Sequence, residues 1–109
     1  MTIVMGSRRV AEYKTLVVAY QPDDPRVRFW PDDTDPNRAH LDVRALLEDG
    51  GEPYAIIMEC VHRLAAGERL VLHALMQPRP LMSQLGRMGY GLAVSHVGTD
   101  HWELEISAP

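Results

Sequence analysis

Five histidines and a single cysteine are the side chains of this chain best suited to chemistry at neutral pH. His96 and His101 flank the last predicted turn, and a two-residue loop Gly98–Thr99 would set their imidazoles face to face, where they could share a metal ion. A three-residue loop would instead keep the apolar side chains together on one face, pairing Val94 with Leu104 and Leu92 with Ile106. The apolar pattern favours this second register, which turns His101 away from His96. The two histidines are therefore only weak metal candidates.

The other chemically active side chains have less support from their surroundings. His62 falls in a predicted helix and His73 in a predicted strand, and neither has further metal ligands at a recognisable spacing. We interpret both as surface or packing residues. Cys60 lies in the middle of the same helix, away from the helix N-terminus that would stabilise a thiolate, and it has Glu59 beside it, with His62 and Arg63 following. We expect a structural cysteine, and the alternative is a redox or sulfur-relay residue.

A polar cluster before the first predicted helix is the main candidate for ligand binding. Asp42 and Arg44 end a predicted strand, Gly50 and Gly51 expose the start of the helix, and Glu52 could cap it. The free N–H groups and the dipole of a helix start attract anions. The alternative is that these side chains only form ion-pair and capping contacts with one another.

The N-terminal segment, residues 1–40, is predicted to contain a β-hairpin that is part of the sheet or appended to it. Residues 15–20 are rich in β-forming side chains, and residues 26–30 alternate between polar and apolar types. The five residues between them contain two prolines and two aspartates, which favour a turn. Residues 31–40 are polar and proline-broken and are expected to form a loop.

Residues 41–107 are predicted to form one βαβαββ domain. A short strand at 41–44, which could extend through Ala45–Leu46, precedes a helix that begins at Pro53 and is capped by Gly67. That helix has one apolar stripe, made of Tyr54, Ile57, Met58, Val61 and Leu64. The predicted elements that follow are a strand at 70–74, a second helix that starts near Pro80, and a hairpin of 91–97 with 101–106. The second helix is predicted to bury Leu81, Leu85 and Met88 and to be capped by Gly89. This order predicts an α+β fold, a two-layer sandwich with two helices on one face of a mixed sheet.

Several short motifs in this region occur in a consistent order: Leu41-Asp42-Val43-Arg44, Glu52-Pro53, the run from Leu64 to Leu70, Pro78-Arg79-Pro80-Leu81, and His101-Trp102-Glu103-Leu104. In these motifs the chain resembles the TusA/SirA-like sulfur carriers, and more closely a related bacterial domain of unknown function. The resemblance implies the same βαβαββ fold. Sulfur carriers of this type hold a persulfide on the cysteine of a Cys-Pro-x-Pro motif at the first helix. Here the corresponding position is Gly50, which has no side chain to carry sulfur, and Cys60 does not align with it.

Composition narrows the classes of partner. The net charge is −4, and 11 basic residues are scattered among 15 acidic ones, so we expect no nucleic-acid partner. No apolar run reaches the roughly 18 residues of a membrane span, so we expect no membrane contact and a cytoplasmic protein. A single cysteine excludes an internal disulfide. We expect a monomer or a weak homodimer formed through an exposed sheet edge.

No set of residues is assembled for catalysis, and no cofactor motif is present. The sequence therefore favours a non-catalytic binding or regulatory module that takes a small anion or a protein partner at the start of the first helix. The alternatives are sulfur relay or redox chemistry through Cys60, and metal binding by histidines.

Overall fold

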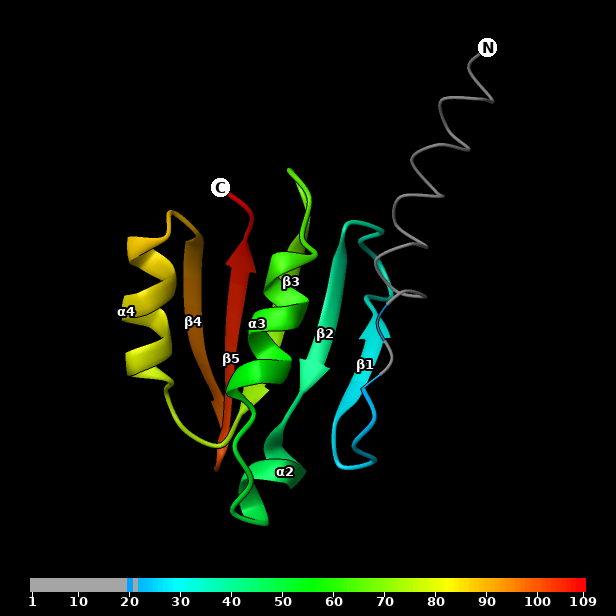
Figure 1. Ribbon diagram of the computed structural model, residues 1–109, viewed down its shortest axis with the longest axis vertical. Helices are drawn as coiled ribbons and strands as arrows, with labels where there is room; N and C mark the ends of the chain where they lie inside the picture. Colours follow the sequence, from blue (N-terminus) through cyan, green and yellow to red (C-terminus); the bar gives the residue numbers. More distant parts are fainter. Residues whose placement is uncertain (1–19, 21) are drawn as a thin grey trace.

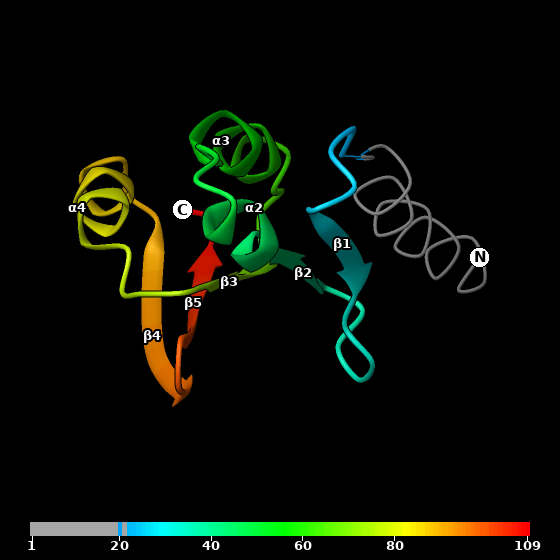
Figure 2. The same cartoon turned by 90° about the horizontal axis from the view of Figure 1, so that it is seen from below.

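A computed structural model describes residue 20 and residues 22–109 and shows a five-stranded mixed sheet with helices on one face (Figures 1 and 2). The strands are β1 (Arg28–Pro31), β2 (Arg38–Asp42), β3 (Arg69–Ala74), β4 (Gly91–Gly98) and β5 (His101–Ser107), in the sheet order β1-β2-β3-β5-β4. The helices are α2 (Arg44–Glu48), α3 (Tyr54–His62) and α4 (Arg79–Arg87). Among these described strands, only β2 and β3 pair in parallel. The predicted α+β two-layer fold is confirmed.

The core lies between the sheet and the helices. Alternate residues of the strands point toward the helices, because strand side chains alternate between the two faces of a sheet. They meet the buried faces of α3 and α4, and the central residues of this core are Leu41, Leu70, Leu72, Leu104, Ile106, Ile57, Val61 and Leu85. The opposite face of the sheet has no helix over it in the part of the chain that the structure describes (Figure 2). None of the described helices has the length and apolar character needed to cross a membrane.

The N-terminal part of the sheet includes residues that were predicted to form a loop. The first strand of the predicted hairpin, residues 15–20, lies outside the described residues except for Tyr20. β1 pairs antiparallel with β2, and β2 begins at Arg38, so the predicted loop at 31–40 is too long. Ala39 and Leu41 are fully buried, and they supply the apolar face of a strand whose other residues are polar.

The strand predicted at 41–44 ends at Asp42, so its predicted end at Arg44 and its extension through Ala45–Leu46 are both wrong, because residues 44–48 form α2. The Asp42 carboxylate accepts the backbone N–H of Arg44 at 3.0 Å and turns the chain out of the sheet. The N–H of Leu47 then donates to the Val43 carbonyl at 3.0 Å, which closes a helical turn, and Leu46 packs into the core.

Helix ends account for two further differences. α3 ends at His62, and Gly67, with φ of +86°, forms the turn before β3 rather than the predicted helix cap. Met88, predicted to be buried, is 41% exposed because it is the C-cap residue of α4, where the helix leaves the core. Gly89 follows it with φ of +94°, which confirms the predicted left-handed cap.

The predicted register of the last hairpin is confirmed. Val94 pairs with Leu104, Leu92 with Ile106 and His96 with Trp102. Gly98 then pairs with His101, so the turn itself contains only Thr99 and Asp100. A bulge at Val97 absorbs the one-residue difference between the two pairings.

Candidate functional site

The predicted ligand-binding residues lie at the end of β2 and on the connection from there to α3, and among them Asp42 and Arg44 contact each other. Arg44 Nη2 lies 2.8 Å from Asp42 Oδ2 in an ion pair at the end of β2. Burial acts to raise the pKa of Asp42, but the hydrogen bonds from Arg44 outweigh it and hold that pKa below its usual value. Asp42 and Arg44 are therefore charged and satisfied by each other.

The two glycines shape the turn that leads into α3. Gly50 has φ of +80°, a left-handed conformation that favours glycine. A Cβ on Gly51 would lie 2.8 Å from Leu46 Cγ and still closer to Leu46 Cδ1, so only glycine fits against this buried side chain. Glu52 Oε1 then accepts the N–H of Tyr54 at 2.9 Å. A carboxylate of the chain itself thus occupies an N–H group that an external anion would use.

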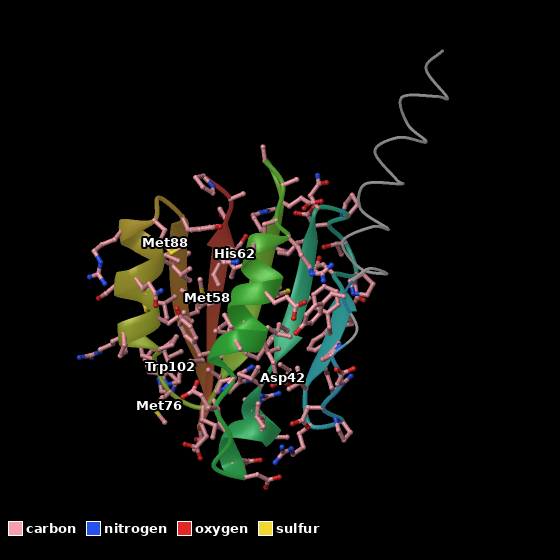
Figure 3. All side chains as sticks on the ribbon, in the orientation of Figure 1. Asp42, Met58, His62, Met76, Met88 and Trp102 are labelled. Atoms are coloured by element: carbon pink, nitrogen blue, oxygen red, sulfur yellow. The ribbon has the colours of Figure 1, made fainter. Side chains whose placement is uncertain are left out.

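A half-open pocket of about 450 Å³ lies where the start of α3 meets the end of β3 and the first turns of α4. Its innermost lining residues are buried and apolar: Val43, Ile57, Leu72 and Ala74. Tyr54 and Gln84 lie at its rim, where Gln84 Nε2 donates to Tyr54 Oη at 2.6 Å and links the two helices. Met76, also in the lining and strongly exposed, appears on the opposite side of the start of α3 from Asp42 in the view of Figure 3.

Among the five predicted ligand-binding residues, only Glu52 lines this pocket. It is also the only charged side chain among the described residues of the lining. A pocket with mostly apolar walls and a few polar groups is the usual form of a small-molecule site. The sequence did not reveal it, because the pocket is built by three elements that are separate in the chain.

Cys60 lies on the sheet-facing side of α3 and is fully buried. Burial raises the pKa of its thiol to about 12. The thiol is therefore protonated at neutral pH and has no access to a soluble sulfur donor.

The structure separates the two predicted metal candidates. His96 stacks on Trp102 with ring centroids 4.2 Å apart. Trp102 pairs with His96 on one side and with Ala74 on the other, so all three side chains lie on the side of the sheet that the helices cover. His101, one position away along β5, points to the open face. There it meets His73, with His101 Nε2 2.9 Å from His73 Nδ1.

His101 and His73 belong to a row of three histidines across three strands. His73 Nε2 lies 2.9 Å from His40 Nδ1, and His40 Nε2 lies 2.6 Å from Asp32 Oδ1. Trp30 stacks on His40 at 5.1 Å and shields that end of the row. His73, in the middle, is only 6% exposed, and its burial lowers the pKa of the imidazole despite the nearby carboxylate of Glu103.

The row was not predicted from the sequence, because His40 falls in the predicted loop at residues 31–40. With β2 extended back to Arg38, strand alternation puts His40 on the same face as Asp42, and Asp42 is the parallel partner of His73. The register between β3 and β5 then adds Glu103 opposite His73. These pairings join residues far apart in the chain, and no local pattern signals them.

The family model with the description "Uncharacterized conserved protein (DUF2249)" matches residues 40–108, which is more than half of the chain. No curated protein and no solved structure matches significantly.

Proposed function

The chain belongs to the DUF2249 family of uncharacterised conserved proteins, and we propose that it is a non-catalytic binding module whose ligand occupies the pocket at the start of α3. The observation that carries this proposal is the pocket itself, about 450 Å³ with buried apolar residues at its base. This volume lies within the range of small-molecule sites.

The lining favours a neutral or cationic organic ligand with an apolar body. Glu52 places a negative charge at the pocket, and none of the described lining residues has a basic side chain to offset it. The first N–H of α3 already donates to Glu52. For both reasons we propose this class of ligand in place of the small anion expected at a bare helix start.

The order of the elements supports a TusA/SirA-like frame as a further part of the proposal. The aligned position of the sulfur-carrying cysteine is Gly50, and Cys60 is enclosed by the core. Sulfur relay therefore finds no support in the side chains, and the frame serves binding instead.

Three indoles that differ in charge test the proposal by ligand-observed NMR: tryptamine, indole and indole-3-acetate. We expect weak saturable binding, with a Kd of about 1 mM for so few non-hydrogen atoms. Tryptamine and indole should bind more tightly than indole-3-acetate, because Glu52 repels the carboxylate.

Two variants control this experiment. Leu81→Glu adds a second negative charge to the apolar wall and should weaken the binding of indole and indole-3-acetate strongly. Val97→Glu changes an exposed apolar residue of β4 that does not line the pocket, and it should leave binding unchanged. Tightest binding by indole-3-acetate, or equal binding of indole by wild type and Leu81→Glu, would contradict the proposal.

A further inference from the structure

A second site lies on the open face of the sheet, apart from the pocket. His73 comes from the central strand β3, and His101 and Glu103 come from its neighbour β5. One nitrogen from each imidazole and one oxygen of the carboxylate lie within 4.8 Å of one another. Imidazole nitrogen and carboxylate oxygen are the ligands of many zinc sites.

The three distances fit a single metal ion. His73 Nδ1 lies 2.9 Å from His101 Nε2, and Glu103 Oε2 lies 3.7 Å from the first nitrogen and 4.0 Å from the second. The point equidistant from these three atoms is about 2.1 Å from each, which is the length of a zinc–nitrogen bond. A tetrahedral ion would need the two nitrogens to separate to about 3.3 Å, a movement of a few tenths of an ångström.

Asp32 sets the direction of the hydrogen bonds in the row. An ionised carboxylate only accepts, so His40 Nε2 donates to Asp32. Hydrogen bonds with Arg38 and Thr34 hold that carboxylate in place. A neutral His40 then accepts at Nδ1, and His73 donates to it from Nε2.

This arrangement leaves His73 Nδ1 without a proton and directs its lone pair toward His101 and Glu103. That is the tautomer a metal ligand requires. A carboxylate that orients a ligating histidine is a recurrent feature of metal sites, and here the orientation passes through a second imidazole. An ion between His73 and His101 would replace the hydrogen bond between the two rings.

We propose that His73 Nδ1, His101 Nε2 and the Glu103 carboxylate bind a divalent transition-metal ion of the zinc type, and that Asp32 and His40 position His73. The mixed nitrogen and oxygen set disfavours Mg²⁺ and Ca²⁺, which take oxygen ligands. Three protein ligands leave a fourth position open, on the side where His101 and Glu103 are partly exposed to solvent.

Titration of the metal-free protein with Zn²⁺ in a calorimeter, and with Co²⁺ in a visible spectrometer, tests the site. We expect one equivalent of each ion, with the Co²⁺ absorption bands of nitrogen coordination. His101→Ala should abolish stoichiometric binding, and Glu103→Gln should weaken it at least tenfold. These two residues are chosen because they are less buried than His73, so their variants should fold.

His62→Ala and His96→Ala are the matched controls, since each removes a histidine outside the row, and both should bind zinc like the wild type. Absence of saturable binding at millimolar zinc would overturn the proposal. Unchanged binding by His101→Ala, or loss of binding in His96→Ala, would also overturn it.

Asp32→Asn tests the positioning role separately. It should weaken Zn²⁺ binding about 10- to 100-fold while the number of sites stays at one. In the metal-free protein, the ¹⁵N shifts of His73 should move away from the pattern of an Nε2-protonated ring. An unchanged His73 tautomer in Asp32→Asn would contradict this role even if the metal site itself is confirmed.

Discussion

The turn before α3 contains Gly50 and Gly51, and substitution of each glycine tests a different physical requirement of the turn. In Gly51→Ala, the new methyl group would lie 2.8 Å from Leu46 Cγ and 3.1 Å from the Leu46 carbonyl oxygen. Leu46 is buried against the core and cannot turn away freely. Overpacking of this kind costs about 1–3 kcal/mol, so we expect the free energy of unfolding to fall by about 2 kcal/mol. The melting temperature should fall by about 10 °C for a domain of this size.

Gly50→Ala is the matched control, because nothing lies within 4 Å of its added Cβ. Its cost comes only from the left-handed backbone, at φ of +80°, and should be about 1 kcal/mol. Urea unfolding of both variants in wild-type and Leu46→Ala backgrounds separates the two causes. The cost of Gly51→Ala should largely disappear when Leu46 is shortened, whereas the cost of Gly50→Ala should stay within about 0.5 kcal/mol. Equal costs of Gly51→Ala in both backgrounds would refute the packing argument.

Three further predictions concern the rest of the fold. Leu85→Ala should lower the free energy of unfolding in urea by about 3 kcal/mol, because the Leu85 side chain is fully buried. Met88→Ala should change it by less than about 1 kcal/mol, and similar losses in the two variants would show that α4 packs differently. Cys60 should resist iodoacetamide at pH 8 until the protein unfolds, and rapid native labelling would argue against its burial. Because its folded pKa of about 12 exceeds the usual value of 9.0, the stability from its protonated thiol should be present below pH 9 and lost as pH rises toward 12. Asp100 has φ of +54°, so Asp100→Ala should be about 1 kcal/mol less stable than Asp100→Gly in thermal unfolding, and the opposite order would exclude backbone strain as the cause.

Local patterns were sufficient to predict the last hairpin. Leu92, Val94, Leu104 and Ile106 must share one face if they are to be buried, and only one register allows this. The bulge at Val97 was not predictable, because it changes the turn without changing which side chains are buried.

Short apolar runs were less informative. Ala45–Leu46 fits either a strand or one turn of helix, and the choice depends on the hydrogen bond from the Arg44 N–H to Asp42. Ala39 and Leu41 are the two apolar residues of β2, and both are fully buried. The other three residues of the strand are polar, so its sequence looks like a polar loop.

Both candidate sites depend on contacts between distant segments. The pocket needs α3, α4 and the end of β3 together, and the histidine row needs the pairing of β2, β3 and β5. The sequence identified Glu52 and His101 as candidates. It could not indicate that Glu52 borders an apolar pocket or that the partner of His101 is His73.

Amide NMR during a tryptamine titration is the most direct measurement of the central claim, that the chain binds its ligand at the start of α3. We predict saturable shifts that cluster at residues 52–57 and 76–84, with little change at His73, His101 and Glu103 on the opposite face. Largest shifts on the open face of the sheet, or no saturable shift with tryptamine or indole, would contradict the proposed function.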